Sequence, residues 1–187
     1  MKLSEIVAAA ATLLGREEIN EYLLDTTTEN VSATTLAEVD TMTRLANLVL
    51  NELAGSYIPM VCTEKVTPVN GRVYYSELDR KILKIRGVYD DYGRKLFFVV
   101  HPEYLHARGE ADSVEYEYLP DNLGLTEETG YLDKDVSVSV LAYGLAAEVC
   151  LSENRFDEAV MWRKRYSDGV ASFALPESAV MKSRCWL

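Results

Sequence analysis

Apolar residues recur at helical spacing in two runs near the start of the chain. The first run covers residues 4–24, where Gly15 predicts a stop or a kink. The second begins at Thr35-Leu36-Ala37-Glu38, which matches a helical capping box, and it ends at Gly55. The second helix is expected to bury one face, made of Leu36, Val39, Met42, Ala46, Val49, Leu50 and Leu53.

From residue 57 to about residue 119 the apolar positions change to a period of two, which predicts β-strands. Asn70-Gly71 tolerates the positive φ angles of a type I′ turn and therefore predicts a tight hairpin. Asp90-Asp91-Tyr92-Gly93 separates the apolar stretches 82–89 and 95–100 in the same manner. A strand with one solvated face is predicted where Val114, Tyr116 and Tyr118 alternate with Ser113, Glu115 and Glu117.

Helical patterning returns after the polar stretch 120–130. Residues 136–140 alternate as a strand would, but the Ala-rich continuation 141–148 favours a helix by its length and composition. A short turn at residues 153–155 leads to a last helix, and so short a turn predicts antiparallel neighbours. The expected buried side of the last helix consists of Phe156, Ala159, Val160, Tyr166, Val170 and Phe173.

The apolar faces before and after the strands have no evident cover except each other. We therefore expect an α+β fold, mainly an α-helical bundle of about four helices with an inserted small antiparallel β module. The bundle would be discontinuous, formed by residues 1–56 and 131–175, with the β module at 57–130. Residues 176–187 would form a separate C-terminal tail.

Charge narrows the classes of function that fit this chain. Its formal net charge is −11 and its sequence pI is about 4.7, which disfavours direct DNA binding because affinity for nucleic acid comes mostly from Lys and Arg. Solubility alone explains the acidity equally well. Of two basic clusters, Arg80-Lys81 with Lys84 and Arg86 is expected on a strand edge. Arg163-Lys164-Arg165 is expected to be solvated or to pair with acidic neighbours.

Three cysteines, Cys62, Cys150 and Cys185, lie far apart and form no CxxC pair, which favours reduced thiols. Cys150 lies in an apolar helical run and is expected in the core. No apolar run approaches the roughly 20 residues that span a bilayer, and residues 1–18 contain no clear signal-peptide cleavage site. The expected location is therefore the cytoplasm.

No motif of a known catalytic or cofactor site is present. His101, Glu103 and His106 do not have the spacing of a standard metal-ligand set, and Pro102 prevents a regular helix there. P-loop, nucleophile-elbow and dinucleotide-binding motifs are missing. The acidic pair Asp90 and Asp91 lies in a predicted turn, where Asp is favoured anyway. We therefore expect no catalytic, cofactor-binding or metal-binding residues and no enzymatic activity.

The C-terminal tail has the composition of an interface anchor. Trp and Arg dominate binding hot spots, and this tail combines basic, apolar and aromatic side chains: Met181, Lys182, Arg184, Trp186 and Leu187. Docking on a partner and folding back over the chain's own bundle both fit this composition.

Residues 140–151 (VLAYGLAAEVCL) and 156–166 (FDEAVMWRKRY) resemble the closing helix pair of tailed-bacteriophage head-to-tail connector (adaptor) proteins. The preceding strands, with residues 75–78 and 115–120, look like the β insertion of the same family. The resemblance covers most of the chain in architecture, and its sequence match is concentrated in about the last third. These are packing motifs and carry no chemical signature.

The resemblance implies a structural virion protein of the neck, assembled in the host cytoplasm, that joins the portal to the stopper or tail. Its partners would be the portal protein, a stopper or tail protein, and copies of itself in a ring, usually a dodecamer. DNA would pass through the lumen without specific binding, which a repulsive acidic lining would assist, and no membrane would be involved. The resemblance also implies that the tail, through Met181, Lys182, Arg184, Trp186 and Leu187, reaches the portal.

Three other interpretations stay open on the sequence. The chain would fit another neck or tail component of the same particle, such as a stopper or a tail terminator. It would also fit a carboxylate-dependent hydrolase, with its acids in the β module, or a helical interaction module unrelated to phage.

Overall fold

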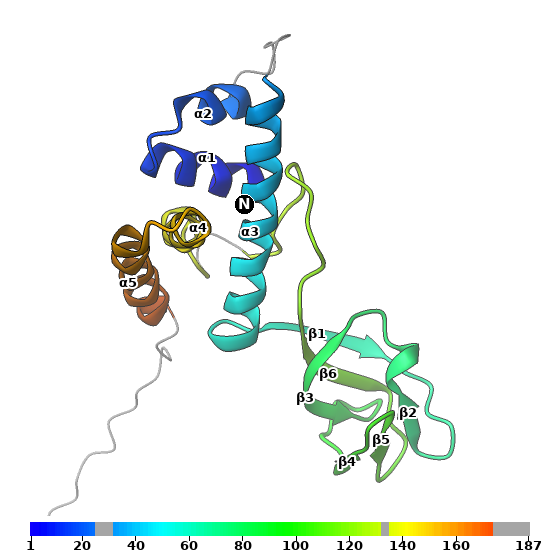
Figure 1. Ribbon diagram of the computed structural model, residues 1–187. Helices are drawn as coiled ribbons and strands as arrows, with labels where there is room; N and C mark the ends of the chain where they lie inside the picture. The colour runs from blue at the N-terminus through cyan, green and yellow to red at the C-terminus, as the bar shows by residue number, and fades with distance from the viewer. Residues whose placement is uncertain (25–31, 132–134, 174–187) are drawn as a thin grey trace, which may run out of the picture.

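Figure 1 shows a computed structural model, which describes residues 1–24, 32–131 and 135–173. These residues form five α-helices and six β-strands, so the protein is of the mixed α+β class. The helices are α1 (Leu3–Leu13), α2 (Glu17–Leu24), α3 (Ala33–Ser56), α4 (Val138–Ser152) and α5 (Phe156–Phe173). The strands are β1 (Met60–Lys65), β2 (Arg72–Tyr74), β3 (Ile82–Tyr89), β4 (Phe98–Val100), β5 (Tyr104–Ala107) and β6 (Ser113–Tyr118), with a 3-10 turn η1 (Tyr75–Glu77).

The helices gather around α4, which contacts α1, α3 and α5 (Figure 1). An α-helix that is apolar on most sides is stable in water only when neighbours cover it, and α4 fits this description. Nine of its residues are buried: Val140, Leu141, Ala142, Gly144, Leu145, Ala146, Ala147, Val149 and Cys150. The main core extends from α4 to α1 and α3 and includes Leu3, Ile6, Val7, Met42, Leu50 and Leu53.

The expected α+β class is confirmed, whereas the bundle of about four helices is not. The described residues form five helices, because the first apolar run divides into α1 and α2 at Gly15. Gly15 has a φ of 69°, a left-handed conformation that favours glycine and ends α1. The interruption predicted at this residue is therefore confirmed.

The predicted capping box at the start of α3 is wrong. The N-cap is Ser32, whose hydroxyl accepts a hydrogen bond from the backbone N–H of Thr34 at 3.1 Å. Thr35 lies inside the helix, where its hydroxyl donates to Glu18 of α2 at 3.3 Å. Glu38 turns away from the helix end and pairs with Arg16. The helix begins earlier because Ser32 is also a good cap and an additional turn buries Thr35 against α2.

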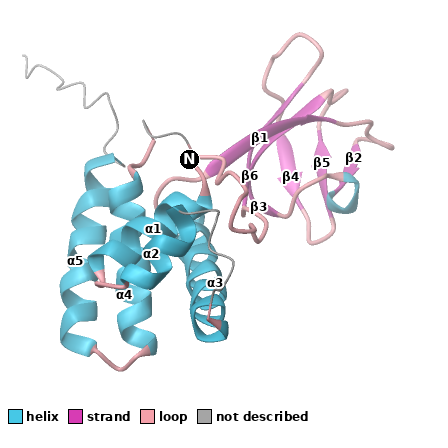
Figure 2. Cartoon of the chain, turned by 90° about the horizontal axis from the view of Figure 1, so that it is seen from above, coloured by secondary structure: helices cyan, strands magenta, loops and turns pink. Residues whose placement is uncertain are grey.

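The strands form two three-stranded antiparallel sheets, with the orders β1-β6-β3 and β2-β5-β4. Figure 2 shows both sheets on one side of the helices. The sheets enclose a second core, made of Val73, Val88, Leu105, Ala107, Ala111, Val114 and Tyr116. Val114 and Tyr116 are fully buried, so the predicted alternation along β6 is confirmed.

Two predicted turns are also confirmed. Asn70 and Gly71 have φ values of 55° and 74°, as a type I′ turn requires. Val69 and Arg72 close this turn with backbone hydrogen bonds of 2.9 and 3.1 Å. Gly93 has a φ of 74° in the second turn, which leads from β3 towards β4.

The chain returns from β6 to the helices along α3, and Figure 1 shows this segment beside it. The Asn47 side-chain amide donates to the Leu123 carbonyl at 2.9 Å and accepts from the Leu123 N–H at 2.8 Å. The backbone N–H groups of Leu3 and Ser4 donate to Glu127 and Leu125. Residues 119–130 therefore pack with the helical core, although the sequence groups them with the β module.

The ambiguous stretch 136–140 contains the start of a helix, as expected. Ser137 is the N-cap of α4, and its hydroxyl accepts from the Val140 N–H at 3.4 Å. Among the helices of the described ranges, none is long and apolar enough to cross a membrane.

Candidate functional site

The residues proposed from sequence for partner binding lie outside the described residues. They are Met181, Lys182, Arg184, Trp186 and Leu187. A candidate site built from the described residues must therefore come from the helices and the β module.

The predicted buried side of α5 is partly wrong. Ala159, Tyr166 and Val170 are buried as expected, and Trp162 joins them because its stacking on Tyr143 faces α4. Phe156, Val160 and Phe173, in contrast, are exposed. The helix contains two apolar stripes, and among the described residues only the stripe facing α4 is covered.

The exposed stripe of α5 continues across two neighbouring helices. We define the three-helix patch as Leu48 of α3, Leu151 of α4, and Val160 and Arg163 of α5. The exposed fractions of its apolar side chains are 54% for Leu48, 43% for Leu151 and 70% for Val160. Covering these side chains with a partner would be favourable, because full burial of one apolar side chain contributes about 1.5–3 kcal/mol.

Two grooves run through the three-helix patch. One, of about 610 Å³, lies between α3 and α4 and is lined by Leu48, Leu119 and Leu151. The other, of about 320 Å³, lies between α4 and α5 and is lined by Leu151, Val160 and Lys164. Leu151 and Arg163 border both grooves, so the two form one continuous surface.

Arg163 fixes the polar centre of this surface. Its guanidinium donates to Glu52 of α3 at 2.8 Å through Nη1, and again through Nη2, and to Glu148 of α4 at 3.4 Å. Hydrogen bonds to the Glu52 carboxylate raise the pKa of Arg163 above its usual range. The Arg163 side chain thus links α5 to α3 and α4. The expectation that the basic cluster 163–165 pairs with acidic neighbours is confirmed for Arg163.

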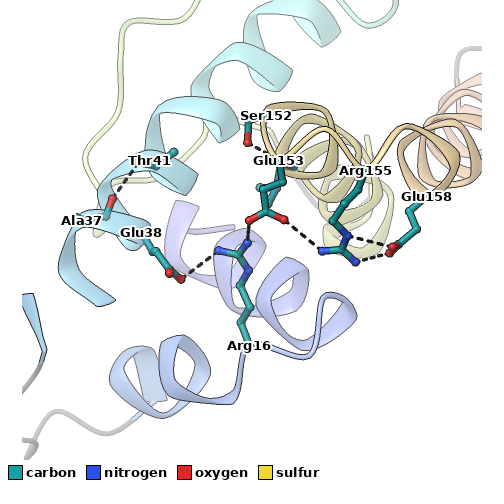
Figure 3. Close-up of polar contacts among 9 residues, drawn as sticks. Arg16, Ala37, Glu38, Thr41, Ser152, Glu153, Arg155 and Glu158 are labelled. Carbon is teal, nitrogen blue, oxygen red and sulfur yellow. Dashed lines mark hydrogen bonds and ion pairs between the residues drawn. The ribbon is translucent and has the colours of Figure 1, made fainter. Parts of the chain in front are cut away.

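A second polar network joins the other helix ends (Figure 3). Arg16, between α1 and α2, pairs with Glu38 of α3 at 3.0 Å and with Glu153 at the end of α4. Arg155 pairs with Glu153 at 3.2 Å and with Glu158 of α5. The Glu158 and Glu153 carboxylates raise the pKa of Arg155. This network holds the helices in register and leaves its carboxylates engaged with cations.

The histidines and acidic residues of the β module that the sequence offers as metal ligands or catalytic groups do not lie together. His101 stacks on Tyr104 with 4.6 Å between the ring centroids, whereas His106 lies on β5 opposite Arg72 of β2. Within the described ranges there is no group of three His, Cys, Asp or Glu residues placed to hold a metal ion. Asp90 is bound to its own turn through Arg94.

Both cysteines in the described ranges carry free thiols. Cys150 is fully buried, as predicted, and burial raises the pKa of its thiol. Cys62 is half-buried beside Glu64, which also accepts the hydroxyl hydrogen of Tyr116. Burial and these neighbours raise the pKa of Tyr116 far above its usual range, so the phenol remains neutral.

The protein is of the α+β class with a β insertion. Its helices expose apolar side chains around the Arg163 guanidinium, which is held by Glu52 and Glu148. Compared with protein-family models and with curated proteins, the chain gives no match.

The three-helix patch was missed by the sequence reasoning, which assigned Val160 to the core. A signal was present in the spacing, because Phe156 and Val160 form a second stripe offset from Ala159, Trp162, Tyr166 and Val170. Two apolar stripes on one helix indicate two covered faces, and among the described residues only one of these faces of α5 is covered.

Proposed function

We propose that this protein is a structural subunit of a tailed-bacteriophage head-to-tail connector, working as one copy in a ring and catalysing no reaction. The observation that carries the proposal is the three-helix patch. Contiguous exposed apolar surface bordered by polar groups is typical of protein–protein contacts. The patch therefore supports an assembly role for the helical part.

The geometry suits a ring contact. Neighbours in a ring meet through two different surfaces, so each subunit needs a receiving groove and a projecting face. The patch would supply the receiving surface, with grooves on either side of Leu151, and would meet a different surface of the neighbouring subunit. Arg163, held by Glu52 and Glu148, requires no rearrangement on docking.

The residues that carry the resemblance to connector proteins support the same proposal. In this chain they make the contact between α4 and α5: Tyr143 stacks on Trp162, and Gly144 lies against Tyr166. These contacts fix the position of α5 relative to α4, and therefore the positions of Leu151 and Val160 in the three-helix patch. The bundle of about four helices, which the apolar faces of the sequence predict, remains part of this proposal.

In the proposed ring, a dodecamer by the resemblance, the neighbours are further copies of this chain, the portal on one side and a stopper or tail protein on the other. The C-terminal tail would bind the portal through Met181, Lys182, Arg184, Trp186 and Leu187. The net charge of −11 suits a lumen through which DNA slides. The protein would reside in the virion neck after assembly in the host cytoplasm, without cofactor or membrane.

The test is co-assembly with the portal protein of the same particle, followed by native mass spectrometry and negative-stain symmetry analysis. Leu48→Glu should reduce the yield of rings at least about tenfold, because it places a charge in the apolar contact. Leu36→Glu is the matched control. Leu36, which the sequence places wrongly on the buried face, is also exposed on α3, at 45%. It lies about 18 Å along the helix from Leu48, and its variant should assemble normally.

Deletion of residues 176–187 separates the two contacts. The shortened chain should lose the portal from a pull-down and keep its own helical fold by circular dichroism. Unchanged portal binding would show that the tail is not the portal contact. Rings that form with a stopper or tail protein but never with a portal would favour another neck component. Failure of the wild-type chain to form any oligomer with the portal would overturn the proposal.

A further inference from the structure

The β module carries a groove that the proposed ring contact does not use. Strands β3 and β4 leave the Asp90–Gly93 turn as a hairpin, joined by the hydrogen bond from the Leu96 N–H to the Val88 carbonyl at 2.8 Å. They then separate, because β3 pairs with β6 and β4 pairs with β5. Between the separated strands lies a groove of about 740 Å³, lined by Tyr75, Ser76, Arg80, Lys81, Ile82, Leu83, Lys84, Ile85, Val100, His101 and Pro102.

Edge strands contribute to both walls of this groove. β3 and β4 are the last strands of their sheets on the sides that face each other. On β4, the Phe97 carbonyl accepts from Arg108 and the His101 N–H donates to Tyr104, so alternate residues bond to β5. The N–H and carbonyl of Val100 therefore face away from β5, towards the groove. An extended peptide can bind to such edges by strand addition.

The side chains around the groove are basic and apolar. Arg80, Lys81 and Lys84 line one wall, and no Asp or Glu is among the lining residues. Arg80 is engaged with the Tyr118 ring, 4.4 Å from its centroid. Lys81 and Lys84 are exposed and have no ion-pair partner in the described part of the chain. Leu83 and Val100 add exposed apolar surface on opposite walls.

We propose that this groove binds an extended segment of a partner protein that carries acidic side chains, as a strand added between β3 and β4. Backbone hydrogen bonds to the two edges would supply the affinity. Carboxylates opposite Lys81 and Lys84 would select the partner, while Leu83 and Val100 would take its apolar side chains. The proposal is independent of the ring contact, which lies on the helices.

The positions of the lysines are consistent with this assignment. Lysine on an edge strand prevents association with most other strands, because burial of the ammonium group is unfavourable. A strand with acidic side chains at matching positions is the exception, since cross-strand pairs of opposite charge are favourable. The same side chains thus protect the edge and select the ligand. A nucleic acid would meet only two free ammonium groups and could not use the unpaired backbone edges.

The experiment uses the full chain and three fluorescein-labelled probes in 0.1 M salt. The first probe is a ten-residue peptide alternating Glu with Val and Thr, the second is the same peptide with prolines in place of Val or Thr at two central positions, and the third is a thymidine decanucleotide. Fluorescence anisotropy should show binding of the first probe alone. Amide NMR shifts of the labelled protein should change at residues 82–85 and 98–100.

Two variants separate charge from backbone pairing. Lys81→Glu with Lys84→Glu should weaken binding of the first probe about tenfold, through loss of two exposed ion pairs and the repulsion that replaces them. Val100→Pro should weaken it by a similar factor, because proline removes the N–H that faces the groove but leaves the ladder to β5 intact. Val100→Thr retains this N–H and the β-branched shape, and it should bind as the wild type does.

The proposal is overturned if the proline-containing peptide binds as well as the first probe, or if Val100→Pro binds normally while the charge reversal abolishes binding. Either result would describe a site for charge alone. Binding of the decanucleotide with no binding of the acidic peptide would assign the groove to nucleic acid and would also overturn the proposal. Circular dichroism verifies that each variant is folded.

Discussion

Asp90 shows how a single carboxylate defines a turn in the β module. It accepts hydrogen bonds from the backbone N–H groups of Tyr92 at 3.0 Å and Arg94 at 2.8 Å, and from the Arg94 guanidinium at 2.8 Å. Partial desolvation raises the pKa of Asp90, but the bonds and the charge from Arg94 outweigh it and lower this pKa below its usual value. The carboxylate of Asp90 is therefore used structurally, as the turn composition predicts.

We predict that Asp90→Asn lowers the midpoint of thermal unfolding by about 2 °C at pH 7. Because the folded-state pKa of Asp90 is depressed, its contribution is complete above the unfolded pKa of about 3.9 and is lost as the pH falls through the lower folded-state value. The difference between Asp90→Asn and the wild type should thus diminish between pH 5 and pH 2.5.

Asp91→Asn is the matched control for this prediction, because Asp91 is the adjacent residue and its side chain is exposed. Its substitution should leave the midpoint unchanged at both ends of the pH range. Equal effects of the two substitutions would show that general charge, and not the bonds made by Asp90, determines the stability of the turn.

Among the elements, the pair α4 and α5 depends on glycine at one close contact. A Cβ atom placed on Gly144 would lie 2.9 Å from a ring carbon of Tyr166 and 2.9 Å from a methyl carbon of Val49. Both neighbours are nearly or fully buried and have little freedom to move. Glycine at this position therefore permits α4 to approach both α3 and α5.

Gly144→Ala should accordingly lower the free energy of unfolding by about 1–3 kcal/mol, the usual cost of overpacking a core. Gly55→Ala is the matched control within α3, where the added Cβ would lie 3.8 Å from Leu119 in ordinary contact. That variant should be unchanged or up to about 1 kcal/mol more stable, through the higher helix propensity of alanine. Urea unfolding measures both, and a stabilised Gly144→Ala would contradict the packing described here.

The order of the elements was predictable because their periods differ clearly. The change from helical spacing to alternation marked the β module, and Asn70-Gly71 and Gly93 marked its turns through the positive φ angles that they tolerate. The start of α3 was predicted wrongly, since Ser32 and Thr35 are both good caps and burial of Thr35 against α2 decides between them. Such a choice depends on tertiary contacts that a local pattern does not contain.

The candidate site was less predictable than the fold. Apolar spacing identifies stripes on a helix, but it does not say whether a stripe meets another part of the same chain. Val160 was therefore assigned to the core, and Leu48 was not singled out at all. Of the basic cluster Arg80–Arg86, Lys84 and Arg86 lie on an edge strand, β3, as predicted, whereas Arg80 and Lys81 precede it. The separation of β3 from β4 depends on long-range pairing.

At the scale of the whole molecule, two cores are joined through few residues. The helical core and the core of the β module are separate, and Tyr118 packs against both. Figure 1 shows the six strands beyond one end of α3, connected to the helices by the entry to β1 and the exit from β6. Met60 and Tyr118 are ladder partners at this junction, so the two connections lie side by side.

This arrangement predicts that the helical part folds without the strands, as expected for an insertion between residues 1–56 and 131–175. Residues 61–117 can be replaced by Asn-Gly, because Met60 and Tyr118 face each other and a two-residue turn joins such a pair. The shortened chain should keep the helical circular dichroism signal and a cooperative urea transition, and its free energy of unfolding should fall by no more than about 2 kcal/mol.

The control replaces residues 120–130 by an equally long Gly-Ser segment. It should lose more stability, because it removes the Leu123 and Leu125 side chains that pack against the helical core and hold this segment in place for its backbone bonds to Asn47, Leu3 and Ser4. If the chain without its strands fails to fold while the control stays stable, the strands are part of the helical folding unit and residues 57–130 are not a separable module.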